Sequence, residues 1–146
     1  MVIVWATVSI LVATLIEAGL SPETPQSECM LGQAEVELDV FSGAPNPTWT
    51  LTDRETEALI ERLARLPPAK ASTLMGNLGY RGFIVYVTPE LDPQLIRVQA
   101  GIVEISGGAS SSYRRDRGRS LERWLLNTGR PFVKKELLQA VENALR

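Results

Sequence analysis

Apolar and polar residues alternate strictly over residues 34–40, where the acids Glu35, Glu37 and Asp39 separate the apolar positions. A period of two residues is typical of a strand with one buried face. The sequence therefore predicts a strand here, with its acids on the solvent side. Three carboxylates on one strand face are also the arrangement that a bound hard cation or an acid–base pair would require.

Two further apolar segments predict strands. Residues 83–87 form a dense apolar run, which favours a central strand covered on both faces. Residues 95–105 form a longer run in which the apolar positions change parity at Gly101. A bulge at Gly101 would explain this change, and a tight hairpin at the same place is the alternative.

Apolar residues at helical spacing predict three helices. The first begins at Thr52, which forms a capping box with Glu55, and it ends near residue 66 before two prolines. The second covers about residues 119–128, with Gly129 suited to the position just beyond the helix end. The third covers residues 134–145.

The remaining segments are read as loops: residues 42–48, 69–82 and 106–118, the last rich in Ser, Gly and Arg. The predicted order is strand, helix, strand, strand, helix, helix. This order favours an α+β fold, a small and mostly antiparallel sheet with helices packed on one face. We expect one such domain over residues 33–146, preceded by an N-terminal apolar leader.

The leader is an uncharged run over residues 2–16. Its length suits the apolar part of an export signal and falls short of an ordinary membrane span. Residues 1–20 are therefore interpreted as a signal peptide or a membrane anchor, with a buried segment or a misplaced start as alternatives. Residues 21–32 are read as a linker that contains Cys29, either an inert thiol or half of an intermolecular disulfide. We expect an exported protein, periplasmic or secreted, or a membrane-anchored one.

Composition removes several classes of enzyme. The 146 residues include no His and one Cys, so catalytic triads that need His, imidazole metal sites and internal disulfides are excluded. There is no phosphate-binding glycine loop and no dinucleotide fingerprint. We assign no catalytic residue, metal or cofactor, and the sequence favours a protein that is not an enzyme.

The loop at residues 45–49, Pro-Asn-Pro-Thr-Trp, is the most distinctive local feature. Asn46 could present its amide to a ligand, and Trp49 could offer a stacking face. Arg81, just before the second strand, could bind an anion bidentately. The structural alternatives are that Asn46 bonds its own turn, Trp49 packs over the following helix, and Arg81 pairs with an acid of the first strand.

Charge is unevenly distributed along the chain. Residues 1–53 hold seven acids and no Lys or Arg, and residues 54–146 hold 10 acids and all 15 bases. Arg114, Arg115 and Arg117 crowd beside Tyr113 and form a candidate anion-binding element. The alternative is a solvated loop whose arginines pair with nearby acids. The net charge of −2 argues against nucleic acid as a partner.

The segment Phe41-Ser42-Gly43-Ala44-Pro45-Asn46-Pro47-Thr48-Trp49 resembles a Phe-Ser-Gly-x-Pro-Asn-Pro-x-Trp pattern of uncharacterised small bacterial proteins, which are often exported. Residues 80–83 and 121–126 resemble later parts of the same pattern. The resemblance covers about a fifth of the chain. It implies a bacterial, single-domain protein and carries no known activity.

These observations favour a non-enzymatic binding or interaction domain that is exported or tethered to a membrane. Its expected partner is a protein or an anionic surface, with membrane contact through residues 2–16. Two alternatives remain: a small hydrolase or lyase that uses carboxylates and Arg81, and a structural or inhibitor-like partner protein.

Overall fold

Six antiparallel strands form one sheet in the order β2-β1-β3-β4-β5-β6. The computed structural model describes residues 32–72, 74, 79–88 and 95–146. The strands are β1 (Ala34–Leu38), β2 (Thr48–Thr50), β3 (Phe83–Val87), β4 (Leu95–Gln99), β5 (Ile102–Gly107) and β6 (Ser110–Arg115). The helices are α1 (Asp53–Arg65), α2 (Ser120–Gly129) and α3 (Lys135–Ala144), with a short 3-10 turn at Arg117–Arg119 before α2. The α+β class and the antiparallel sheet are thus confirmed.

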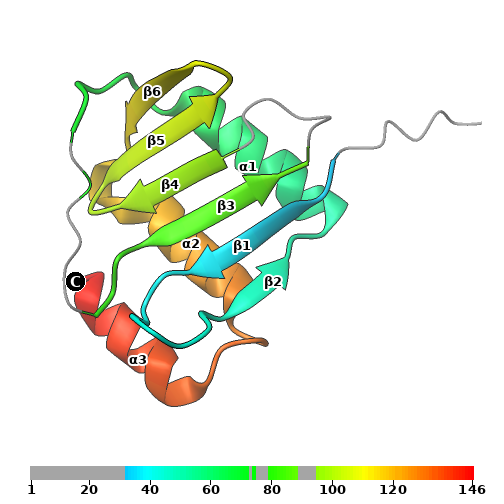
Figure 1. Ribbon diagram of the computed structural model, residues 1–146, viewed down its shortest axis with the longest axis vertical. Helices are drawn as coiled ribbons and strands as arrows, with labels where there is room; N and C mark the ends of the chain where they lie inside the picture. Colours follow the sequence, from blue (N-terminus) through cyan, green and yellow to red (C-terminus); the bar gives the residue numbers. More distant parts are fainter. Residues whose placement is uncertain (1–31, 73, 75–78, 89–94) are drawn as a thin grey trace, which may run out of the picture.

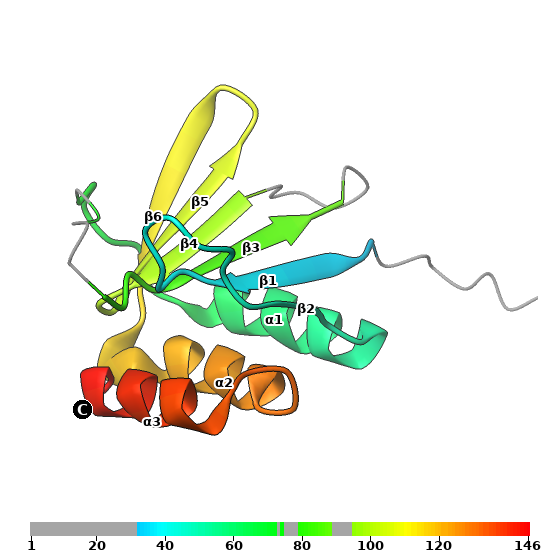
Figure 2. The ribbon, with the colours of Figure 1, turned by 60° about the horizontal axis from the view of Figure 1, so that its bottom comes forward.

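All three helices lie on one side of the sheet (Figures 1 and 2). α1 and α2 cover the sheet, and α3 lies beside α2. The core between these layers consists of apolar residues that are almost completely buried, among them Val36, Val85, Ile96, Leu59 and Leu125. Burial of such side chains is the main source of stability. We call the opposite, helix-free side of the sheet the outer face.

The first helix begins as its sequence predicts. The Thr52 side chain accepts a hydrogen bond from the Glu55 amide, and the Glu55 carboxylate accepts one from the Thr52 amide. α2 begins differently, because no capping side chain precedes it directly. Asp116, almost fully buried, accepts hydrogen bonds from the Leu121 and Glu122 amides instead.

Two segments of the sheet differ from the sequence predictions. The change of parity at Gly101 comes from a tight hairpin between β4 and β5. The predicted bulge is therefore wrong, and the hairpin given as its alternative is confirmed. Ala100 and Gly101 both have positive φ, which suits a two-residue turn of this kind. Residues 106–118, expected to be a loop, complete β5 and form all of β6.

β3 is central, but its two faces are not equally covered. Phe83 and Val85 are buried under the helices, while Tyr86, on the outer face, is 45% exposed. The prediction that both faces of this strand are covered is therefore wrong. Thr48–Thr50 adds a short edge strand that the turn-rich sequence around it did not indicate.

None of the helices among the described residues is long and apolar enough to span a membrane. The predicted leader (residues 1–20), the linker up to residue 31 and Cys29 lie outside the described residues.

Candidate functional site

The outer face carries a row of directly paired residues that runs across the strands. The register pairs Glu37 with Ile84, Ile84 with Arg97, Arg97 with Glu104, and Glu104 with Tyr113. Neighbouring strands lie about 4.8 Å apart, so adjacent members of the row are close enough for one ligand to touch several. Charged and aromatic side chains therefore gather where no helix covers the sheet.

Asn46 fastens the loop between β1 and β2 to the end of this row. Its side-chain oxygen accepts hydrogen bonds from the Val40 and Phe41 amides, at 3.0 and 2.8 Å. Its side-chain nitrogen donates to Glu37 at 2.7 Å and to Asp39 at 3.3 Å. The structure therefore uses both ends of the Asn46 amide within the protein.

Arg81 lies beside this loop and pairs with Asp39. Its Nε donates to the Asp39 carboxylate at 3.0 Å, and a terminal nitrogen donates to the same carboxylate and to the Phe41 carbonyl. The hydrogen bond to Asp39 raises the pKa of Arg81. Backbone bonds in both directions hold residues 81 and 82 against Asp39. Of the three acids offered as partners by the sequence, Asp39 is the one that Arg81 contacts.

A buried network anchors the segment that carries Arg81. The Tyr80 hydroxyl donates to Glu122 at 2.6 Å, and Glu122 also accepts from the Gly101 amide and from Arg119. Burial, and then the charge of Glu122, raise the pKa of Tyr80 well above its ordinary range. Glu122 is fully buried, so its charge is compensated inside the protein by Arg119.

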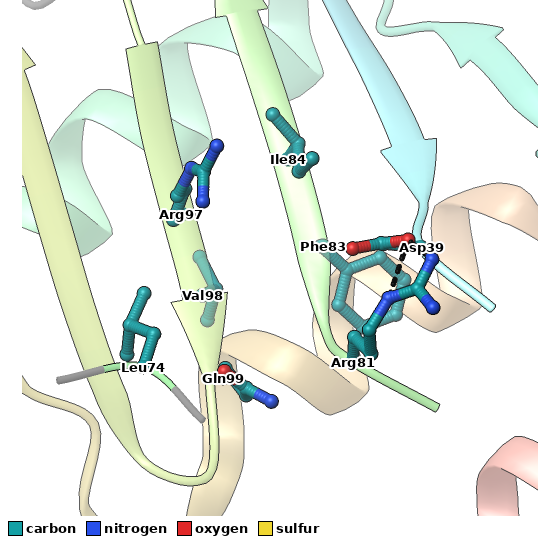
Figure 3. A pocket seen from close by; sticks show the side chains of 8 residues that line it. All are labelled: Asp39, Leu74, Arg81, Phe83, Ile84, Arg97, Val98 and Gln99. Carbon is teal, nitrogen blue, oxygen red and sulfur yellow. Dashed lines mark hydrogen bonds and ion pairs between the residues drawn. The ribbon is translucent and has the colours of Figure 1, made fainter. Parts of the chain in front are cut away.

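A hollow of about 120 Å³ opens on the outer face between β1, β3 and β4 (Figure 3). Arg81 with Asp39 borders it on one side and Arg97 on the other, and Ile84 and Gln99 add to its lining. The lining thus combines two guanidinium groups, one carboxylate and one amide with four apolar residues, Leu74, Phe83, Ile84 and Val98. A second, larger hollow of about 400 Å³ lies on the other side of Arg97 and is lined in part by Ser72, Glu104 and Tyr113.

Arg97 differs from the other charged groups around these hollows. It is exposed, and it forms no hydrogen bond and no ion pair with any residue that the structure describes. Asp39 and Arg81 satisfy each other, Glu37 accepts from Asn46 and from Tyr86, and Glu104 accepts from Tyr113 at 3.1 Å. Arg97 therefore offers an unused guanidinium to both hollows.

Trp49 lies on the opposite side of the sheet. It is 4% exposed, packs edge-on against Phe83, and donates from its indole nitrogen to Thr128 at 3.0 Å. Its ring also fills the space next to Gly129, where a Cβ atom would lie 2.6 Å from it. Trp49 consequently presents no stacking face to a ligand, and we remove it from the candidate site.

The three arginines proposed as an anion-binding element do not share one loop. Arg114 and Arg115 lie in β6, and Arg117 lies in the 3-10 turn that follows it. Arg114 is half-buried and donates to the Leu66 carbonyl at 3.2 Å, while Arg115 and Arg117 are exposed. Of the pairing expected with the nearby acids, the structure shows that of Arg119 with Glu122. Asp116 and Glu122 are buried, and neither pairs with Arg114, Arg115 or Arg117. Arg115 and Arg117 remain available to solvent.

The acids of β1 do not assemble a metal site. Among the described residues, no three Asp, Glu, His or Cys side chains are placed to hold a metal ion. Glu37 and Asp39 instead accept hydrogen bonds from Asn46, Tyr86 and Arg81. These hydrogen bonds commit both carboxylates to structural contacts within the protein.

Sequence reasoning missed Arg97, Glu104 and Tyr113 as members of one site. A signal was present, because Arg97 is the only charged residue within residues 95–103 and therefore marks the solvent side of that strand. The hairpin that brings Glu104 beside it was expected only as the alternative to a bulge at Gly101, and the hairpin that brings Tyr113 beside Glu104 was not predicted. Comparison of the chain with protein-family models, with curated proteins and with solved structures finds no match.

Proposed function

We propose that this protein is a binding domain and that its ligand surface is the outer face around Arg97. The ligand supplies an anionic group to the Arg97 guanidinium. In line with the sequence analysis, we further propose that the domain works after export or while tethered to a membrane, as the resemblance to small exported bacterial proteins also implies.

The observation that carries this proposal is the Arg97 guanidinium at the junction of two hollows, which has no hydrogen-bond or ion-pair partner among the described residues. Arginine forms planar, bidentate contacts with carboxylates and phosphates, which makes it a common anchor for anions. Arg54, Arg115 and Arg117 also have no side-chain partner within the described part of the chain, but they line none of the hollows described there. Arg146 lines a separate hollow beside α2 and α3, away from the outer face. Arg97 thus combines an available charge with a concave surface.

We favour binding over catalysis because the carboxylates near Arg97 already accept hydrogen bonds from other residues of the protein. A general base must reach a proton on the substrate, and its acceptor sites must be free to do so. The Glu37 oxygens accept from Asn46 at 2.7 Å and from Tyr86 at 3.1 Å, and Asp39 is held by Arg81. We therefore assign these acids to the framework of the site rather than to a reaction.

Titration of the full chain with sodium acetate and with inorganic phosphate tests the proposal. At constant ionic strength, we expect saturable shifts of backbone amide NMR signals in β3, β4 and β5, and we expect Arg97→Gln to abolish them. Arg54→Gln, which removes an equally exposed arginine from α1, should leave them unchanged. Equal responses from both variants, or no saturable response from the parent, would overturn the proposal.

A further inference from the structure

The two hollows that meet at Arg97 differ in charge. The smaller one has two guanidinium groups and one carboxylate, while the larger one has Arg97, Glu104 and neutral hydroxyl groups. Leu74 borders both hollows and Ala71 borders the larger one, but polar groups line much of each hollow and neither is a large apolar pocket. We infer that the ligand is a carboxylated saccharide whose carboxylate binds at Arg97 and whose hydroxylated ring occupies the larger hollow. This inference rests on the proposed function and specifies its ligand.

The carboxylate fits the smaller hollow because of the balance of charge there. The negative charge of Asp39 is balanced by the positive charge of Arg81, with which it forms an ion pair. Among the described residues that line the smaller hollow, the charge left without an ion-pair partner is that of Arg97. A carboxylate between the two arginines would face Arg97 directly. Charge-assisted contacts of this kind are stronger than neutral hydrogen bonds.

The larger hollow favours a hydroxylated body over an apolar one. An apolar group placed there would remove water from Arg97, Glu104 and Ser72 without replacing the hydrogen bonds that the water makes, which is unfavourable. Sugar hydroxyls can donate to the Glu104 carboxylate and accept from Arg97 and Ser72. The volume of about 400 Å³ accommodates a ring that bears several hydroxyls.

Tyr113 supplies an aromatic surface at the far side of the same hollow. Its hydroxyl donates to Glu104 on the neighbouring strand, and this hydrogen bond raises the pKa of Tyr113 and holds the side chain in place. An aromatic side chain that is already fixed loses little conformational entropy when a ligand packs on it. Tyr113 is therefore suited to contact the apolar face of a sugar ring.

The test compares three probes on the full chain by NMR titration at constant ionic strength: glucuronate, glucose and acetate. We expect glucuronate to bind at least ten-fold more tightly than either acetate or glucose. Tyr113→Ala should remove most of that advantage, measured as the ratio of the glucuronate and acetate affinities of the same variant. Glu104→Gln should also lower this ratio, because a neutral amide is a weaker acceptor for sugar hydroxyls and no longer repels acetate from the neighbouring Arg97. Tyr86→Ala is the matched control, because Tyr86 lies on the same face but borders neither hollow.

The outcomes separate this inference from the proposed function. If acetate and glucuronate bind through Arg97 with equal affinity, the anion site stands and the saccharide assignment is wrong. If none of the three probes binds, both fail. Amide NMR spectra that match those of the parent away from the outer face show that Tyr113→Ala and Glu104→Gln are folded. A glucuronate affinity that is unchanged in both of them would overturn the placement of the ring.

Discussion

The hydroxyl of Tyr80 donates a 2.6 Å hydrogen bond to the carboxylate of Glu122, across 42 residues of sequence. Tyr80 precedes β3, and Glu122 lies in the first turn of α2. Glu122 also accepts from Arg119 and from the Gly101 amide in the hairpin between β4 and β5. One buried carboxylate therefore joins the helical layer to two parts of the sheet, next to the segment that carries Arg81.

Tyr80→Phe should destabilise the protein by about 1–3 kcal/mol, because the buried Glu122 carboxylate loses a donor that nothing else replaces. Urea unfolding measures this change. Tyr86→Phe removes the exposed hydrogen bond to Glu37 and should cost clearly less. Equal losses in the two variants would contradict the role given to the buried network.

Stability should fall as the pH rises above about 10, the ordinary pKa of tyrosine. Burial and Glu122 raise the pKa of Tyr80 in the folded state, so the folded chain retains a proton that the unfolded chain releases. Fewer protons on the unfolded state mean that the free energy of unfolding decreases with pH. Unfolding curves between pH 9 and 11 should therefore show a shallower decline for Tyr80→Phe than for the parent, and parallel declines would argue against this origin.

Gly129→Ala should destabilise the protein by about 1–3 kcal/mol, although alanine ordinarily stabilises a helix relative to glycine. The reason is steric, since the new Cβ would lie 2.6 Å from the Trp49 ring. Thermal unfolding gives the magnitude. In a Trp49→Phe background the ring is smaller, so the same substitution should cost less there. A stabilising effect in the parent would show that the packing of Trp49 on α2 is described wrongly.

Replacement of Arg115 and Arg117 by Gln should leave the free energy of unfolding within about 0.5 kcal/mol of the parent, because both side chains are exposed. Arg114→Gln should cost about 1 kcal/mol, since Arg114 donates to the Leu66 carbonyl. Urea unfolding distinguishes the two. Salt-dependent binding of the parent to a sulfated polysaccharide, lost when Arg114, Arg115 and Arg117 are all replaced by Gln, would restore these arginines as a second anion-binding element. Its absence leaves them as exposed charges.

The parts of the fold that could be predicted are those that a local pattern determines. The alternation before Val40 predicts β1, and the capping box at Thr52 predicts the start of α1, because burial and capping act within a few residues. β6 was missed because Ser110, Ser111 and Ser112 carry no apolar signal. This strand exists because its backbone pairs with β5 and because Pro67 and Ala69 bond to its outer edge.

Several residues of the candidate site could not be predicted for the same reason, because strand pairing brings them together and no local pattern does. The structural contacts of Asn46 with its own turn and of Arg81 with an acid of the first strand could be given as alternatives from the sequence, because turn residues and a charge beside an apolar strand are local features. Arg97, Glu104 and Tyr113 become neighbours only through two hairpins, of which the first was the alternative to a bulge at Gly101 and the second was not predicted. Gly129 was expected at a position beyond its helix, yet it lies inside α2, where contact with Trp49 requires the absence of a Cβ.

The most direct test of the binding surface observes the Arg97 side chain itself. In the full chain without ligand, the Arg97 Nε–H should exchange with water as fast as that of the exposed Arg54, whereas the Arg81 Nε–H should be protected by its 3.0 Å bond to Asp39. Added acetate should slow exchange at Arg97 and leave Arg54 unchanged. An Arg97 Nε–H that is already as protected as that of Arg81, or that does not respond to acetate, would contradict the account.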